Sequence, residues 1–146
     1  MEEALKEARK AYDIDEVPIG AVVVKNGEII GRGHNLRESE KDPTLHAEMI
    51  AIREAAAKVK SWRLTDCEIY VTIEPCPMCA GAIIQARIDR LIFGARDPKA
   101  GCARSLYNLL EDHRFNHRVE VIESIMEEQC RDIITTFFRN KRNKKS

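Results

Sequence analysis

Two short stretches of the chain, about thirty residues apart, hold residue types that could bind a metal ion. His46 and Glu48 lie in the first stretch, and Cys76 and Cys79 lie in the second. One imidazole and two thiolates supply three ligands for zinc and leave a fourth coordination position open, as in catalytic zinc sites. The carboxylate of Glu48 is then left to move protons. We therefore predict one zinc ion held by His46, Cys76 and Cys79, with Glu48 as the catalytic residue.

The chemistry expected of this set is the removal of an amino group from a heterocyclic ring by water. In a favourable zinc site the pKa of water falls from about 15.7 to about 7, which gives a nucleophile at neutral pH. Glu48 would take the proton of that water, pass it to a ring nitrogen and later to the leaving amine. Because one carboxylate is used twice, the set suits hydrolytic deamination.

Two other interpretations of the CxxC pair stay open. A structural zinc site has four protein ligands, and Cys67 or Cys102 could supply the fourth. A redox-active pair of thiols would need neither His46 nor Glu48. The order H-x-E followed by P-C-x-x-C favours the catalytic interpretation, because neither alternative has a use for the carboxylate.

The local sequence predicts how these four residues are positioned. Cys76 and Cys79 are three apart, so that on a helix both sulfurs share one face, and the positive end of the helix dipole favours thiolates. His46 and Glu48 are two apart and point to different sides of a helix. Both can serve one site only from its first turns. We expect that helix to begin within residues 42–44, where an Asp-Pro-Thr sequence supplies a cap and an early proline.

The rest of the chain predicts a mixed sheet with helices on both faces, since a hairpin is followed by alternating helices and strands. An Asn-Gly pair at 26–27 is typical of the hairpin turn. Ser124 and Glu127 indicate a capping box, and the apolar stripe from Met126 to Phe138 is expected in the core. Helices are expected at 2–13, from 42–44 to about 60, from Pro75 or Pro77 to 86, at 105–112 and after 124, and strands at 17–24, 28–33, 69–73, 91–93 and 119–122.

Composition fits a single domain spanning residues 1–146. Basic and acidic residues both number 24, but five of the basic ones lie in a tail at 139–146 that has no acid. This tail is either a solvated, frayed end or an electrostatic arm for phosphates. Five cysteines, an odd number, indicate a reducing compartment. With no membrane-length apolar run and no signal-peptide pattern, we expect a cytoplasmic protein.

Beyond the metal signature, the chain resembles the bacterial tRNA-specific adenosine deaminases over nearly its whole length. H-x-E with P-C-x-x-C is itself the signature of zinc nucleobase deaminases. Residues 36–41 match no pattern of that family. The further matching stretches are EVPIGAV at 16–22, GHN at 33–35, DPT at 42–44, TIEPC at 72–76, AGA at 80–82, FGARD at 93–97, NHRVE at 116–120 and FFR at 137–139.

The resemblance implies conversion of adenosine to inosine at the wobble position of a tRNA anticodon. It also implies a homodimer with one zinc per subunit and a three-layer α/β/α fold with a mixed, about five-stranded sheet, of the cytidine deaminase type. By the same resemblance Asn35 contacts the flipped base, and Asp97 and Asn116 lie near anticodon nucleotides. Turn chemistry also accounts for these three residues, since Asn and Asp favour loops.

Two other functions are compatible with the motif. Deaminases of free cytidine, cytosine, guanine or deoxycytidylate share the metal ligands, although a basic tail has no obvious use with a free base. A zinc-stabilised RNA-binding module without catalysis would have no need of Glu48 beside the histidine.

Overall fold

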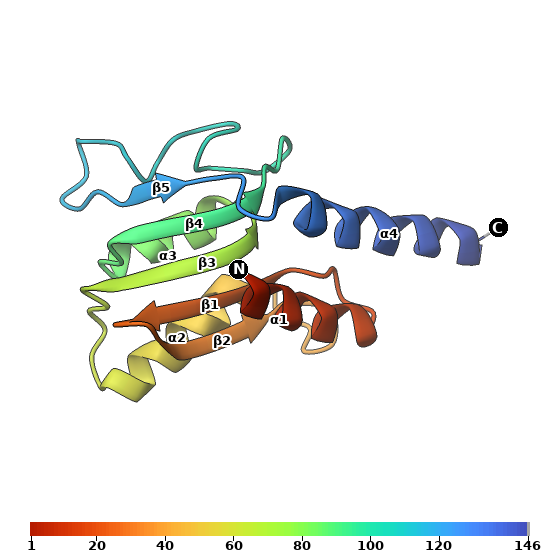
Figure 1. Ribbon diagram of the computed structural model, residues 1–146, viewed down its shortest axis with the longest axis horizontal. Helices are drawn as coiled ribbons and strands as arrows, with labels where there is room; N and C mark the ends of the chain where they lie inside the picture. The colour runs from red at the N-terminus through yellow and green to blue at the C-terminus, as the bar shows by residue number, and fades with distance from the viewer. Residues whose placement is uncertain (146) are drawn as a thin grey trace.

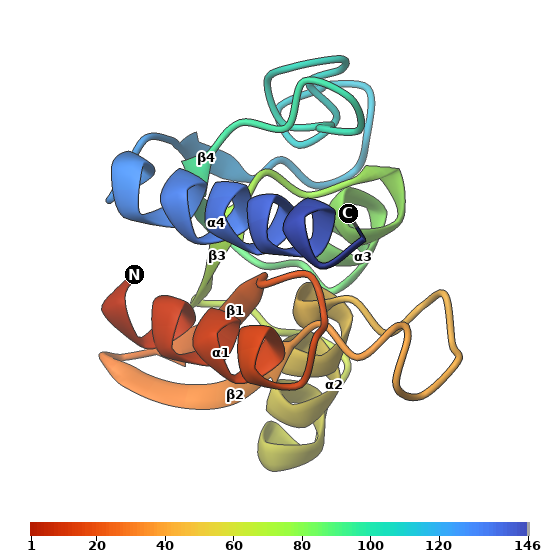
Figure 2. The ribbon, with the colours of Figure 1, turned by 90° about the vertical axis from the view of Figure 1, so that its right-hand side faces the viewer.

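A five-stranded sheet lies between two layers of helices in the computed structural model, which describes residues 1–145 (Figure 1). Helices α1 (Glu2–Asp13) and α4 (Glu127–Lys145) cover one face, and α2 (Ala47–Val59) and α3 (Pro77–Gln85) cover the other (Figure 2). The predicted three-layer α/β/α fold with a mixed sheet is confirmed. In spatial order the strands are β2 (Glu28–His34), β1 (Gly20–Lys25), β3 (Cys67–Ile73), β4 (Arg90–Ala95) and β5 (Glu120–Ile122).

The topology brings four chain segments together at one end of the strands. β1 is antiparallel to β2 and β3, whereas β3, β4 and β5 run parallel. Gly20 at the start of β1 pairs with His34 at the end of β2, and Ile73 pairs with Ala95 at the ends of β3 and β4. The segments that follow β2, β3 and β4, and the one that precedes β1, therefore all leave the sheet on the same side.

Close packing of α2 on the sheet depends on a glycine. A Cβ atom at Gly33 would lie 2.3 Å from the carbonyl oxygen of Ala47, which is the first residue of α2. The absence of a side chain lets the start of this helix approach the backbone of β2. At the opposite edge the hairpin turn is confirmed, because Asn26 and Gly27 both have positive φ, at 51° and 77°.

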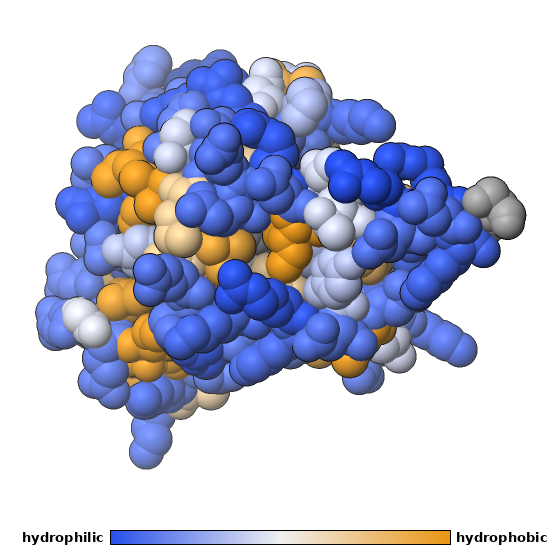
Figure 3. All heavy atoms as spheres, turned by 45° about the vertical axis from the view of Figure 1, so that its right-hand side comes forward, coloured by the Kyte–Doolittle hydropathy of each residue, from blue (hydrophilic) through white to orange (hydrophobic). Residues whose placement is uncertain are grey.

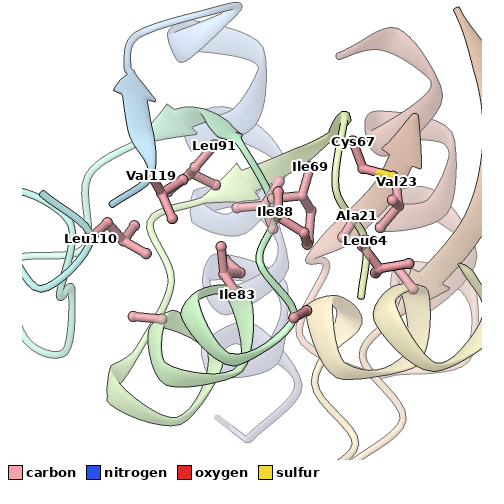
Figure 4. Packing of buried hydrophobic residues seen from close by; sticks show 14 of the residues in the cluster. Ala21, Val23, Leu64, Cys67, Ile69, Ile83, Ile88, Leu91, Leu110 and Val119 are labelled. Atoms are coloured by element: carbon pink, nitrogen blue, oxygen red, sulfur yellow. The ribbon is translucent and has the colours of Figure 1, made fainter. Parts of the chain in front are cut away.

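The main core lies between the sheet and helices α2 and α3 (Figure 4). Ile69 and Leu91 from adjacent strands point toward Ile83 of α3 and Ile88, and all four are fully buried (Figure 4). Burial of such side chains contributes about 1.5–3 kcal/mol each. The core therefore holds rigidly the strands whose ends carry the candidate site.

Several predicted boundaries are wrong for identifiable reasons. β1 begins at Gly20 instead of 17, because Pro18 has no N–H to donate to a neighbouring strand. α2 begins at Ala47 instead of 42–44. The Asp42 carboxylate accepts hydrogen bonds from the N–H (2.8 Å) and hydroxyl (2.7 Å) of Thr44, so the Asp-Pro-Thr sequence closes a turn before the helix.

The C-terminal third of the chain departs further from prediction. Residues 105–112 form turns in place of a helix. Ser124 and Met126 have positive φ, and α4 begins only at Glu127, so the predicted capping box does not form. Phe138 is 42% exposed and does not join the core, although Cys130 and Phe137 of the same stripe are buried. α4 continues past the ends of the strands and includes most of the basic tail (Figure 1); residue 146 of that tail lies outside the described residues.

The face of the molecule seen in Figure 3 is mainly hydrophilic, with apolar residues gathered in smaller patches. Within the described residues, no helix has both the length and the apolar character needed to cross a membrane. The exposed large apolar side chains are Ile14, Trp62, Leu106, Tyr107, Phe115, Ile125 and Phe138.

Candidate active site

Three predicted ligand residues come together at the edge of the sheet where the strand ends gather. The Nδ1 atom of His46 lies 3.6 Å from the Sγ atom of Cys76 and 3.6 Å from that of Cys79. All three atoms lie within 4.8 Å of one another, and Cys79 is fully buried. Cys76 and Cys79 from one stretch and His46 from the other thus form a single group, as their types and spacing predict.

The starts of two helices bring this group together. His46 is the N-cap residue of α2 and Cys76 is the N-cap residue of α3, and both have extended backbone angles. Neither side chain makes a capping hydrogen bond to its own helix. Each is therefore directed into the space between the two helix N-termini, where the helix dipoles favour negatively charged sulfur.

The group fits one zinc ion. Zinc bonds of about 2.3 Å to sulfur and about 2.0 Å to nitrogen place tetrahedral ligand atoms about 3.5 Å apart, and the measured nitrogen–sulfur separations are 3.6 Å. Among the described residues no fourth histidine, cysteine or acid joins the group. Cys67 and Cys102 are buried with their thiols directed at the carbonyl oxygens of Thr65 and Ala100, which argues against a closed, four-ligand site.

Hydrogen bonds polarise the three ligands. The hydrogen bond from the Cys79 thiol, with a further one from His46, lowers the pKa of Cys76 to about 4 despite burial. The same contacts raise the pKa of Cys79 and that of His46. Cys76 is therefore a thiolate at neutral pH, which is the form that binds metal ions.

Glu48 lies at the second position of α2 and is only 3% exposed. Burial raises the pKa of its carboxyl to about 7. A carboxyl group with a pKa near neutrality can both accept and release a proton. No positively charged side chain bonds this carboxylate among the hydrogen bonds and ion pairs of residues 1–145, so it is not held as half of a structural ion pair.

Asn35 shares a cavity with these residues. The small cavity, of about 80 Å³, is lined by Val17, Ile19, Asn35, Arg37, His46, Ala47 and Glu48. Asn35 is buried, its side-chain N–H donates to the carbonyl oxygen of Val17 (3.4 Å), and its side-chain oxygen accepts the N–H of Arg37 (3.2 Å). The structure thus places Asn35 and Glu48 on the same cavity.

A larger groove of about 530 Å³ adjoins the small cavity and shares Val17, Ile19 and Arg37 with it. Asp97 lies on this groove, and its carboxylate accepts the N–H groups of Lys99 (3.0 Å) and Ala100 (3.2 Å). Its turn-forming role is therefore present in the structure. Asn116 is exposed between β4 and β5 and lines neither the small cavity nor the groove.

Sequence patterns did not single out several residues that build the site. Arg37, Arg131 and Phe138 line the groove, and the buried carboxylates of Glu16 and Glu74 hold the segments around it. Glu74 directly precedes the P-C-x-x-C motif, and Glu16, Glu74 and Phe138 all lie in stretches that match the resembled family, but neither signal gave them a role. Arg37 lies in a segment without a family pattern, and Phe138 resembles a core residue by its spacing alone.

A mixed sheet between helices, with a His/Cys/Cys group and a buried glutamate at the starts of two helices, defines the cytidine deaminase-like class of enzymes. Members of this class are in general zinc-dependent. The chain belongs to the MafB19-like deaminase family, whose model matches residues 1–142. It is a hydrolytic deaminase.

Individual relatives agree with this assignment. The chain is 54% identical over 145 residues to the tRNA-specific adenosine deaminase of Bacillus subtilis, covering 99% of this chain and 90% of that protein. A structure from a study of A-to-I editing by tRNA:A34 deaminases at the wobble position superposes with a TM-score of 0.87 and 44% identity, covering 91% of this chain and 96% of that one. Guanine deaminase from Bacillus subtilis matches with a TM-score of 0.62 and 40% identity over 65% and 61% of the two chains.

Proposed function

We propose that this protein is a tRNA adenosine deaminase, which converts adenosine to inosine at the wobble position of the anticodon. The observation that carries this proposal is the 54% identity to a protein of that name along 99% of the chain. All five strands belong to one sheet, which supports a single deaminase domain over residues 1–146. A tRNA substrate would be met in the cytoplasm.

We propose further that His46, through Nδ1, and the sulfur atoms of Cys76 and Cys79 hold one zinc ion per subunit, with the Cys79 thiol losing its proton on binding. Zinc there would supply a water nucleophile at neutral pH and stabilise negative charge on the reacting oxygen. The matching nitrogen–sulfur distances and the thiolate character of Cys76 support this ligand set.

Glu48 is the proposed proton carrier. It would take a proton from water and deliver it to a ring nitrogen of adenine, and a second transfer would release the exocyclic amine as ammonia. One water is consumed and one ammonia leaves, so the ring keeps a carbonyl oxygen and becomes hypoxanthine. Burial of Glu48 beside Asn35 supports this role, because a flipped base would be held by the side-chain amide within reach of the carboxylate.

The groove supports an RNA substrate over a free base. Arg37, Arg96, Lys99 and Arg131 line it, and Phe138 is 42% exposed there. Single-stranded RNA is bound by basic residues that contact phosphates and by aromatic rings on which bases stack. Asp97 lies on the groove and is proposed to contact a nucleotide beside the edited adenosine; Asn116 is proposed to contact the anticodon loop from its exposed segment.

The proposed enzyme acts as a homodimer. Leu106, Tyr107 and Phe115 are 52%, 66% and 46% exposed within one segment, which supports an interface between copies of the chain. A mass in solution of twice that of the chain, measured by light scattering, is the expected result.

A substrate panel tests the proposed function. The zinc-loaded protein is incubated with a tRNA bearing adenosine at the wobble position, the same tRNA bearing guanosine there, and free adenosine, cytidine and guanine. We expect inosine in the first tRNA alone. Glu48→Gln should lower the rate by about 10²-fold or more and keep its zinc. Faster turnover of a free base than of tRNA would instead favour a free-base deaminase, to which the guanine deaminase relative corresponds.

A further inference from the structure

A second buried glutamate lies beside the site and has no part in the proton transfers proposed for Glu48. Glu74 follows the last residue of β3, precedes Cys76 by two positions and is 1% exposed. Its carboxylate accepts hydrogen bonds only from the 97–105 segment among the described residues. The donors are the N–H groups of Asp97 (3.0 Å), Ala103 (3.0 Å), Arg104 (2.7 Å) and Ser105 (2.8 Å) and the hydroxyl of Ser105.

The 97–105 segment closes around this carboxylate. A Cβ atom at Gly101 would lie 2.3 Å from the Cδ atom of Glu74, so only glycine permits the backbone to pass there. The Gly101 N–H donates to the carbonyl oxygen of Asp97 (2.8 Å), and the Cys102 N–H donates to that of Pro75 (2.9 Å). The segment is thus bonded both to the Glu74 side chain and to the backbone just before the ligand Cys76.

The chemistry of these contacts requires a carboxylate. All five partners are donors, and a carboxylate offers acceptor positions on both oxygens. Asp97 and Ser105 donate to Oε1, whereas Ala103, Arg104 and Ser105 donate to Oε2. A glutamine would replace one of these oxygens by an NH₂ group, which would face N–H donors and leave them unpaired in a buried place. No cation is bonded to the Glu74 carboxylate within residues 1–145, so an ion pair does not explain its charge.

We propose that Glu74 is a positioning residue, which fixes the groove-lining part of the 97–105 segment relative to the His46/Cys76/Cys79 group. Asp97 and Lys99 belong to this segment and line the groove. Loss of the carboxylate would leave His46, Cys76 and Cys79 in place and release the part of the groove that Asp97 and Lys99 line. The inference rests on the proposed function only in taking the groove as the surface for RNA.

Kinetics of Glu74→Gln, measured on the zinc-loaded protein with an anticodon stem-loop, test the proposal. We expect KM to rise about tenfold, as the loss of about 1.4 kcal/mol of binding would cause. kcat at saturation should change less than about threefold, and zinc content should stay at one per chain. The matched control is Glu7→Gln, since Glu7 is a buried glutamate of α1 bonded to Arg32 and lies outside the groove. An equal rise in KM in the control would overturn the proposal, because general destabilisation would then explain it.

Amide hydrogen exchange gives a readout that does not depend on activity. Glu74→Gln should speed exchange at Asp97 and at residues 103–105, and Glu7→Gln should leave these amides protected. If the wild-type protein makes no inosine, the proposed function fails, while the exchange experiment still decides whether Glu74 holds the segment. If Glu74→Gln does not fold, Ser105→Ala removes one donor and should raise KM about twofold with faster exchange at 103–105. Unchanged KM and unchanged exchange in the variant that folds would refute the positioning role.

Discussion

At the scale of single residues, the site separates two kinds of buried acid. Glu48 lines the small cavity with Asn35, Arg37 and His46, and within residues 1–145 no ion pair joins its carboxylate to a lysine or arginine. Glu74 is saturated by hydrogen-bond donors of the 97–105 segment and does not line the small cavity. Burial alone therefore does not identify a proton carrier; the hydrogen-bond partners of the carboxylate do.

Zinc binding by cysteine variants tests the ligand set and the open fourth position. We expect Cys79→Ser to lower the zinc content well below one per chain, because a serine hydroxyl does not supply the soft thiolate that the set offers. Cys102→Ser should keep zinc, since the Cys102 thiol is directed at the carbonyl oxygen of Ala100. Metal analysis of both purified proteins measures this. Loss of zinc in Cys102→Ser would instead indicate a closed site with four protein ligands.

The grouping of the candidate site residues could be predicted from the sequence, because they lie in two short local motifs. His46, Glu48, Cys76 and Cys79 form two short motifs whose residue types have few other uses together. Glu16 could not be identified in this way. Its carboxylate accepts the N–H groups of Glu38 (3.1 Å) and Ser39 (2.6 Å), more than twenty residues away, and no local pattern indicates such a contact.

At the scale of elements, helix starts position the site more than helix faces do. α2 begins at Ala47, so that His46 precedes the helix and Glu48 lies in its first turn. The predicted start of this helix at 42–44 was wrong by a few residues. The expectation that His46 and Glu48 share a site only at the start of the helix agrees with the structure. The presence of the strands and the hairpin turn was predictable from β-branched runs and the Asn-Gly pair. The segment at 96–119 was not, because it depends on side chains far away in sequence, such as Glu74.

The basic end of α4 gives a test at this scale. Residues 139–145 are helical. Asn140 donates to the Tyr12 hydroxyl (2.7 Å) and Lys141 pairs with Asp15 (3.6 Å), so the tail contacts α1 and the turn that follows it. Neutralising Arg139, Arg142 and Lys144 to glutamine keeps those contacts. We expect weaker binding of the anticodon stem-loop and a flatter dependence of log K on log salt, by up to about 0.7 per lost phosphate contact.

Deletion of residues 139–146 should have the same effect on the salt slope and in addition lose the contacts to Tyr12 and Asp15. The apolar residues of α4 that pack on the sheet lie upstream and should tolerate the deletion. A salt slope equal to that of the wild-type protein in the neutralised variant would support the interpretation of the tail as a solvated end. Binding titrations at several salt concentrations measure this.

At the scale of the whole molecule, buried carboxylates tie the periphery to the sheet. Burial tends to raise the pKa of Glu7 and of Glu16, but hydrogen bonds outweigh burial and lower both. Glu7 is bonded to Lys10, Arg32 and His34, and Arg32 is also bonded to Glu3. Glu16 is bonded to Ser39 and to the backbone of Glu38, and Arg37 lies nearby. These contacts are stronger while the carboxylates are ionised.

Stability should therefore fall as the pH is lowered. A carboxyl whose pKa is lower in the folded state contributes stability above its unfolded pKa and loses it as pH falls through the folded pKa. We expect the free energy of unfolding to decrease below about pH 4.5, and to decrease less steeply in Glu16→Gln. Urea titrations between pH 6 and about pH 3, with a chelator present throughout, measure this. An equal slope for wild type and variant would contradict the role given to Glu16.

Because the connections after β2, β3 and β4 leave the sheet on one side, the scaffold and its specificity can evolve separately. Substitutions at the exposed positions of these connections would alter which molecule fits and leave the strands intact, whereas buried Cys102, Ala103 and Leu110 of the connection after β4 belong to the core. The guanine deaminase relative, which shares 40% of aligned residues yet matches only about two thirds of this chain, accords with such divergence. Directed evolution toward a new heterocycle would accordingly begin with libraries at 35–41 and 96–100, and leave the strands and the core residues Cys102 and Ala103 untouched.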